Sequence, residues 1–236
     1  TYNKWQAVER PTLFSTLAFV ETTDLNLGET MAKIGSPLEA ALLHKVNAEP
    51  QSIQDYLVDA GQHAIHYTRK LSHFVQILDF VPHIWDEQGR EREPSELKTL
   101  LVRDETARDV FLSILNSTLF YWSLTVYSDC RNLNRREVQS ARFTLDNANG
   151  PVVRDLRRLC RQLMQDIEAR SQVLTMNYRQ LGTLRIQCTY PRYSKPILDE
   201  IDRSLAHHFG FTDEETDFIL NYDIKYRLAG DEDDEQ

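Results

Sequence analysis

Residues 111–138 read FLSILNSTLFYWSLTVYSDCRNLNRREV, the densest apolar run of the chain, which turns polar and basic at residue 128. Apolar side chains recur in this stretch at helical spacing, and Asp104 is a residue type that favours the N-cap position. We therefore predict one long buried helix from Asp104 to about Tyr127. Asn116 and Ser117 lie inside it and need hydrogen-bond partners if they are buried. Residues 128–136 predict a loop with three arginines.

The chain has 236 residues, of which 41% are hydrophobic and 27% charged, a composition typical of one globular domain with or without a small appendage. Its formal net charge of −9 argues against a phosphate-binding surface that covers the whole protein. Residues 212–236 hold most of this excess, because they contain ten acidic and two basic residues. The rest of the sequence is nearly neutral, which leaves room for a local basic patch.

Alternating apolar patterns predict strands at residues 13–22, 63–69, 74–80, 95–102, 137–145, 172–178 and 184–189. Helical spacing and capping residues predict further helices at residues 37–46, 151–167, 196–209 and 213–227. Residues 63–80 resemble a hairpin, and residues 85–94 predict a charged loop. The elements together predict an α+β fold with a mixed sheet and several packed helices. We divide it into residues 1–190 and a C-terminal helical segment, 191–236, with an acidic tail.

Cys130, Cys160 and Cys188 are far apart, and no Cys or His cluster has metal-ligand spacing. We therefore expect reduced cysteines, a cytoplasmic location and no metal site. The first residues lack a basic region followed by an apolar one, so they do not predict a signal peptide. The uncharged run 110–128 has nearly the length of a membrane span. Polar residues interrupt it, and we interpret it as a core helix rather than a membrane contact.

Recognisable catalytic motifs are absent from the sequence, which has no glycine-rich phosphate loop, no HExxH zinc motif and no serine nucleophile elbow. Glu87, Glu91 and Glu93 are of the residue type that coordinates magnesium in nucleases, but a charged run around Gly89 is typical of a solvated loop. A nuclease is therefore the least favoured hypothesis. We assign no catalytic residue and no metal ligand.

Three segments, taken together and in this order, resemble a known family. They are IHYTRKLSHFVQILDFVPHIWDEQG at residues 65–89, LNSTLFYWSLTVYSDCRNLNRREV at residues 115–138 and KPILDEIDRSLAHHFGFTDEETDFILNYDIKYRL at residues 195–228. The set is similar to the C-terminal region of bacterial restriction-modification proteins. These proteins, type IIG-like in organisation, fuse a class I adenine-specific DNA methyltransferase to a target-recognition domain.

The resemblance implies that this sequence is the part of a larger protein that chooses the DNA. In the family, an upstream domain with an Asn-Pro-Pro-Tyr motif and a glycine-containing cofactor motif transfers a methyl group from S-adenosylmethionine to adenine N6. Neither motif occurs here. The resemblance thus implies S-adenosylmethionine for the parent protein and no cofactor for this fragment. The implied partners are double-stranded DNA and the methyltransferase domain of the same polypeptide.

Three basic and aromatic clusters are candidate DNA-binding surfaces, because recognition needs cations on phosphates and polar groups on base edges. The loop offers Arg131, Asn132, Asn134, Arg135 and Arg136. The predicted hairpin offers Tyr67, Arg69 and Lys70. A third cluster contains Tyr190, Arg192, Tyr193 and Lys195.

Each of these features also has a structural interpretation. The loop arginines have Asp129 and Glu137 as nearby ion-pair partners. Acidic residues at helical spacing favour a solvated face for Arg154, Arg157, Arg158 and Arg161. The core is favoured for Phe111, Phe120, Tyr121 and Trp122. A second hypothesis for the whole chain is a protein-interaction or scaffolding module of the same system. It predicts an exposed apolar stripe on the helix at residues 156–167 and no direct DNA contact.

Overall fold

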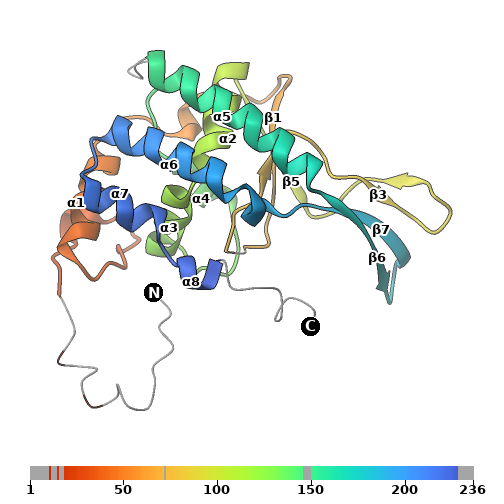
Figure 1. The fold of residues 1–236 in the computed structure, drawn as a ribbon, viewed down its shortest axis with the longest axis horizontal. Coiled ribbons are helices and arrows are strands. Elements are labelled where there is room, and N and C mark those ends of the chain that lie inside the picture. The colour runs from red at the N-terminus through yellow and green to blue at the C-terminus, as the bar shows by residue number, and fades with distance from the viewer. Residues whose placement is uncertain (1–10, 12–14, 16–18, 72, 146–149, 228–236) are drawn as a thin grey trace.

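Antiparallel strands build two separate sheets in the computed structural model, which describes residues 11, 15, 19–71, 73–145 and 150–227 (Figure 1). The first sheet has the order β2-β1-β5 and contains β1 (His63–Thr68), β2 (Ile77–Leu78) and β5 (Leu97–Val102). The second has the order β4-β3-β7-β6 and contains β3 (Ile84–Trp85), β4 (Glu91–Arg92), β6 (Gln172–Tyr178) and β7 (Gly182–Cys188).

The fold is α+β, as predicted, but the expected mixed sheet is wrong. Every strand pair found in the described part of the chain is antiparallel. The physical reason is that parallel neighbours need long crossover connections, whereas β1 and β2, β3 and β4, and β6 and β7 follow one another along the chain through short connections.

The apolar run at the centre of the sequence forms two helices instead of one. α2 (Glu105–Asn116) begins at its predicted N-cap, Asp104, and α3 (Thr118–Tyr127) follows after Ser117 with a bend of 67°. Ser117 ends one helix and caps the next, because its hydroxyl donates to Ile114 O at 2.6 Å and accepts from a backbone N–H of α3. The predicted continuous helix is therefore wrong at this residue.

Six further α-helices lie in the described part of the chain, and three of them confirm predicted helices almost residue for residue. They are α1 (Pro37–Asn47), α4 (Arg135–Gln139), α5 (Gly150–Ala169), α6 (Lys195–Phe209), α7 (Asp213–Leu220) and α8 (Ile224–Arg227). α5 and α6 lie side by side and pack on α2, which also contacts β1, β2 and β5 (Figure 1). The helix α2 is thus the centre of the molecule.

The core around α2 includes the aromatic residues predicted to be buried. Phe111 and Trp122 are completely covered, and Phe120 and Tyr121 are nearly so. The apolar stripe of α5 lies in the same core, and so do Leu198, Ile201 and Leu205 of α6 and Ile219 of α7. The C-terminal helical segment therefore shares one hydrophobic core with the rest of the described chain. Within those described residues no single helix is long and apolar enough to cross a membrane, and α2 and α3 pass that test only as a bent pair.

Asn116, the last residue of α2, makes the hydrogen bonds that its burial requires. Its side-chain nitrogen donates to Ile77 O and to Leu112 O, both at 2.8 Å, and its side-chain oxygen accepts from Ile77 N at 3.2 Å. One buried amide thus joins α2 to β2 and replaces the ladder partner that this short strand lacks on that side.

Three local predictions differ from the structure. The strand predicted at residues 137–145 is wrong, because residues 135–139 form α4, whose first turn is closed by a hydrogen bond from Asn134 N to Glu137 Oε2 at 3.0 Å. The strand predicted at residues 74–80 shortens to β2. The strand predicted at residues 13–22 falls mostly outside the described residues, and residues 19–22 are not in a strand.

The second sheet projects from the helical body as an arm (Figure 1). Its β3–β4 hairpin occupies the predicted charged loop, and Gly89 in the turn has a φ of +75°, a value that favours glycine. The strand β6 lies at the edge of the sheet, and six of its seven residues, all but Met176, are exposed.

Candidate nucleic-acid interface

The predicted loop and the predicted hairpin lie against each other in the structure. Leu133 N donates to Arg69 O at 2.9 Å, and Lys70 forms an isolated antiparallel bridge with Asn132. Leu133 is buried, so an apolar anchor holds the loop on the end of β1. Two of the three sequence-predicted clusters therefore belong to one surface, although more than 60 residues separate them along the chain.

An open cleft of about 320 Å³ lies between that loop and the first sheet. It is lined by Tyr67, Arg69, Lys98, Thr99, Leu100, Leu133, Asn134 and Arg135. Strand pairing places Tyr67 directly opposite Lys98, on the face of the sheet that carries the buried Ile65 and Leu100. The cleft lies where the apolar core face of this sheet ends and the loop residues Leu133, Asn134 and Arg135 form the opposite wall. We call this feature the basic cleft.

The charge of the basic cleft has one sign. Arg69, Lys98 and Arg135 are exposed, and none of the residues found to line the cleft is acidic. Within the part of the chain that the structure describes, none of these three cations has an ion-pair partner. Cations that are held close together without carboxylates repel one another, so an anion that enters the cleft relieves this repulsion.

Tyr67 supplies a neutral hydrogen-bonding group at the base of the basic cleft. Burial raises the pKa of its hydroxyl, and the nearby Arg135 opposes that rise only in part. The hydroxyl therefore stays protonated at neutral pH and remains able to donate a hydrogen bond.

The sequence allows two interpretations of the loop arginines, DNA binding and surface ion pairing, and the structure assigns different surroundings to Arg135 and Arg136. Arg136 forms the ion pair foreseen with Glu137, at 3.2 Å, while Arg135 points to the cleft. Asp129 accepts a hydrogen bond from the backbone N–H of Arg131 at 3.0 Å, which lowers the pKa of the Asp129 carboxyl and shapes the turn. Arg131 itself is exposed beside the basic cleft rather than among its lining residues.

Lys195, a predicted DNA-binding residue, lies inside the protein. It is the first residue of α6, and its ammonium group turns back to Asp199 one turn later and donates to Leu220 O, at the end of α7, at 3.1 Å. The ion pair lies within α6, and the hydrogen bond to Leu220 O joins α6 to α7, so we correct the prediction and exclude Lys195 from the surface.

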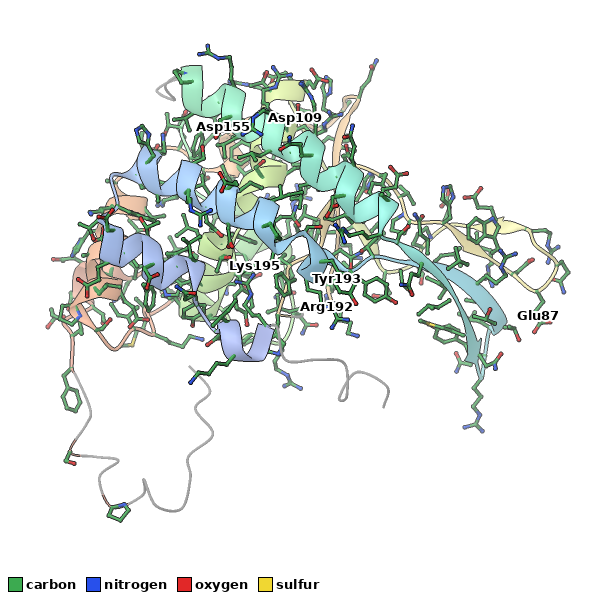
Figure 2. All side chains as sticks on the ribbon, viewed as in Figure 1. Glu87, Asp109, Asp155, Arg192, Tyr193 and Lys195 are labelled. Atoms are coloured by element: carbon green, nitrogen blue, oxygen red, sulfur yellow. The ribbon has the colours of Figure 1, made fainter. Side chains whose placement is uncertain are left out.

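Arg192 and Tyr193 lie where β7 leads into α6, at the base of the arm, and not in the basic cleft (Figure 2). The guanidinium carbon of Arg192 lies 4.8 Å from the centre of the Tyr193 ring, and Nη2 donates to the Tyr193 hydroxyl at 2.9 Å. The third predicted cluster is therefore a separate surface, and part of its hydrogen-bonding capacity is used within the cluster, between Arg192 and Tyr193.

Arg157 and Arg158 on α5 form ion pairs with carboxylates of the protein. Arg157 donates to Glu105 at 2.8 Å and approaches the buried Asp109 at 3.4 Å, so it joins α5 to α2. Arg158 pairs with Asp155 on the solvent side of its own helix. The solvated-face interpretation is confirmed for Arg158, but the partners of Arg157 come from α2 and not from its own helix.

Carboxylates of the β3–β4 hairpin do not form a metal site in the described structure, where no group of three or more potential ligands was found. Glu91 contacts His83, and Glu87, at the outer end of the arm, accepts a hydrogen bond from Thr183 N at 2.9 Å (Figure 2). In the structure these two carboxylates contact groups of the arm itself.

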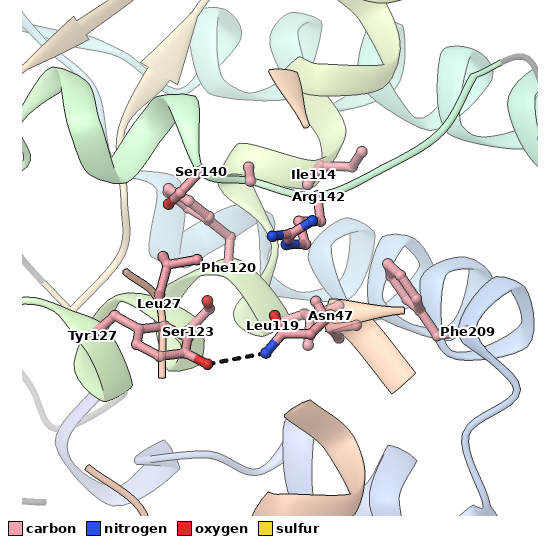
Figure 3. A pocket seen from close by; sticks show the side chains of 12 residues that line it. Leu27, Asn47, Ile114, Leu119, Phe120, Ser123, Tyr127, Ser140, Arg142 and Phe209 are labelled. Atoms are coloured by element: carbon pink, nitrogen blue, oxygen red, sulfur yellow. Dashed lines mark hydrogen bonds between the residues drawn. The ribbon is translucent and has the colours of Figure 1, made fainter. Parts of the chain in front are cut away.

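A second hollow, lined by apolar residues of α2 and α3, is much smaller (Figure 3). Its volume of about 40 Å³ is close to that of one or two water molecules. Arg142 is the only charged side chain among the residues found to line it, and Asn47 and Tyr127 bond to each other across it at 3.2 Å. This hollow is too small for a substrate.

Lys98 is the residue of the basic cleft that sequence reasoning missed. The alternation of Lys98, Leu100 and Val102 places the lysine on the core face of its strand, but only the register with β1 puts it beside Tyr67. Comparisons of this chain with known protein families, with curated proteins and with solved structures find no significant match.

Proposed function

We propose that this domain recognises double-stranded DNA as the target-recognition region of a bacterial restriction-modification adenine-N6 DNA methyltransferase. In this proposal the catalytic domain, which binds S-adenosylmethionine, belongs to the same polypeptide and methylates the DNA that this domain positions. A cytoplasmic location follows from the proposal, since that is where a bacterium keeps its DNA. The fold is then that of a target-recognition domain.

The observation that carries the proposal is the basic cleft. Arg69, Lys98 and Arg135 form a cationic site in a protein whose formal charge is −9, and phosphate groups are the anions that such sites bind on DNA. Asn134 and Tyr67 add groups that donate and accept hydrogen bonds at the same place. A surface of this kind combines phosphate contacts, which set register, with groups able to reach base edges.

The alternative of a protein-interaction module relied on an exposed apolar stripe along residues 156–167. In the structure Leu156, Leu159, Leu163 and Ile167 are buried in the core. That stripe is therefore not accessible to a partner, and the DNA hypothesis remains the better supported of the two.

Binding to duplex DNA at several salt concentrations tests the proposal directly. The chain is incubated with a pool of random-sequence duplexes, and bound molecules are sequenced while affinities are measured by fluorescence anisotropy. We expect enrichment of one sequence motif and an affinity that falls steeply with salt. The triple variant Arg69→Ala, Lys98→Ala, Arg135→Ala should bind at least 100-fold more weakly, with a log-log salt dependence shallower by about 2 to 3.

A matched control removes the same charge elsewhere. Arg158 on α5, Arg170 directly after the end of α5 and Arg203 on α6 are each about half exposed, and each pairs with a carboxylate three or four residues away. Alanine at these three positions should leave DNA affinity within a few fold of the unchanged chain. Equal losses in the two triple variants, or no DNA binding by the unchanged chain at low salt, would overturn the proposal.

A further inference from the structure

The hairpin formed by β6 and β7 has an unusual composition for this acidic chain. Residues 172–188 read QVLTMNYRQLGTLRIQC and contain no Asp or Glu, although the chain as a whole has 36. Two arginines, Arg179 and Arg185, give the hairpin a positive charge. Most of its other polar side chains are amides and hydroxyls, which are groups that both donate and accept hydrogen bonds.

The two faces of this hairpin differ in chemistry. Strand register pairs Thr175 with Arg185 and Asn177 with Thr183, so these polar side chains share one face. Leu174 pairs with Ile186 and Met176 with Leu184 on the opposite, apolar face. The polar face therefore presents hydrogen-bonding groups along β6 and β7, the two strands at one edge of the four-stranded sheet.

The outer end of the hairpin is open to solvent. Arg179 and Gln180 are exposed, and Leu181 is 52% exposed. Asn177 accepts a hydrogen bond from Thr183 Oγ1 at 2.8 Å, and within the described residues its amide nitrogen makes no hydrogen bond. Both N–H groups of that amide therefore remain available to an outside acceptor.

Acidic groups near the hairpin come from the neighbouring β3–β4 turn. Glu87 bonds to Thr183 N, and Asp86 is paired with Arg90 at 2.8 Å. Hydrogen bonds from Thr183 lower the pKa of the Glu87 carboxyl, so Glu87 is ionised at neutral pH and braces the hairpin beside its turn. The guanidinium of Arg185 lies 5.4 Å from the Trp85 ring on β3. Arg179 has no ion-pair partner in the described part of the chain.

We propose that the β6–β7 hairpin is a second DNA-contacting element, which lays its polar face into the major groove of the duplex held by the basic cleft. The inference rests on the proposed function and extends it to a part of the chain outside the basic cleft. A two-stranded ribbon is one of the two protein elements that fit this groove, and Asn and Arg side chains are suited to adenine and guanine edges. The cleft then supplies phosphate affinity, and the hairpin supplies sequence preference.

A double variant of the hairpin separates the two roles. Asn177→Ala with Arg179→Ala removes an amide and a cation from the polar face and the turn. Gln88→Ala with Arg92→Ala is the matched control, since it removes the same two kinds of group from the β3–β4 hairpin of the same arm. All variants are studied in the full chain, with thermal unfolding and light scattering to compare fold and oligomeric state.

With the random duplex pool we expect the Asn177, Arg179 variant to lose most of the enriched motif and to bind the selected duplex about 10-fold or more weakly. It should retain salt-dependent binding to random duplexes through the basic cleft, and the control should behave as the unchanged chain. An unaltered motif and affinity in the hairpin variant would overturn the inference while leaving the proposed function intact. A change in oligomeric state instead of DNA preference would also overturn it, because the arm would then be a protein contact. Absence of DNA binding by the unchanged chain would overturn both proposals.

Discussion

The helical centre around α2 and the projecting arm differ in the partners to which their polar side chains form hydrogen bonds. Around α2, polar side chains that are buried, such as Asn116 and Asp202, bond to the backbone of segments far away in the sequence. In the arm, polar side chains bond mainly to one another across neighbouring strands or remain open to solvent, as Asn177 and Arg179 do. The first arrangement is typical of a scaffold, and the second is typical of a surface that awaits a partner.

This difference predicts which property of the protein a substitution in each region should change. A buried polar group that loses its partner costs the full desolvation of the partner left behind, whereas an exposed group returns to water. We therefore expect substitutions around α2 to change the free energy of unfolding and substitutions in the arm to change binding.

The largest effect is expected at Asp202, on α6. Its carboxylate is fully buried and accepts hydrogen bonds from Thr118 N and Leu119 N, both at 3.0 Å, while Arg227 donates to Thr118 Oγ1 at 2.9 Å. Asp202→Ala leaves the N–H groups of Thr118 and Leu119, in the first turn of α3, without their acceptor and removes a carboxylate that stabilises the buried guanidinium of Arg227. Urea unfolding should show a loss of about 3 to 5 kcal/mol. Glu200→Ala, at an exposed position of the same helix, should change stability by less than about 0.5 kcal/mol.

A smaller loss is expected at Asn116. Replacement by Ala leaves Ile77 N and Ile77 O without the amide that satisfies them, so the free energy of unfolding should fall by about 2 to 3 kcal/mol. Asn221→Ala, which removes an exposed amide bonded to Asp217, is the control and should cost less than about 1 kcal/mol. Hydrogen exchange at the amide of Ile77 should become faster in the Asn116 variant. Equal protection in both variants would show that Asn116 does not hold β2.

Local signals in the sequence were sufficient for much of the scaffold. The Ser36 and Glu39 pair at the start of α1 and the Thr212 and Glu215 pair at the start of α7 are capping patterns, and both helices begin where these patterns place them. Leucines at helical spacing likewise predicted α5. In each case the residues that determine the element are neighbours in the chain, so no tertiary information was needed.

Other features depend on contacts between distant segments and were beyond sequence reasoning. The first turn of α3, directly after the bend at Ser117, is bonded to Asp202 on α6, which lies 84 residues after Thr118. Lys195 carries the same charge as the cations of the basic cleft, but the packing of α6 against α7 turns it inward. Lys98 joins the cleft through strand register. Propensity alone cannot distinguish these positions, because it reports only the residue and its neighbours.

Alkaline titration gives a third test, at Tyr121 in α3. Burial raises the pKa of Tyr121 to about 12, above the 10.0 of an exposed tyrosine. The unfolded chain therefore ionises first as pH rises, and the stability that this group contributes is complete below pH 10 and is lost as pH approaches about 12. Tyr121→Phe should cost about 0.5 to 1 kcal/mol at neutral pH, since it removes only a long hydrogen bond to His73.

The pH dependence of Tyr121→Phe is measured by urea unfolding at pH 8, 10 and 11. The loss of stability between pH 10 and 11 should be smaller in the variant than in the unchanged chain. Tyr178→Phe, on the exposed face of the arm, is the control and should leave this loss unaltered. An identical alkaline loss in all three proteins would mean that Tyr121 is not shielded from water as the structure describes.

The smallest effect on stability is expected on the apolar face of the arm. Leu174 is 36% exposed on the edge strand β6, whereas Leu163 on α5 is fully buried, and each is replaced by Ser in a matched pair. Leu163→Ser creates a cavity and buries a hydroxyl, so it should cost more than about 3 kcal/mol, while Leu174→Ser should stay within about 0.5 kcal/mol. Urea midpoints at neutral pH compare the two. A loss above about 1 kcal/mol at Leu174 would show that this face of the arm is covered in solution. The contrast between a buried core around α2 and a solvent-exposed arm would then not hold for β6, the edge strand.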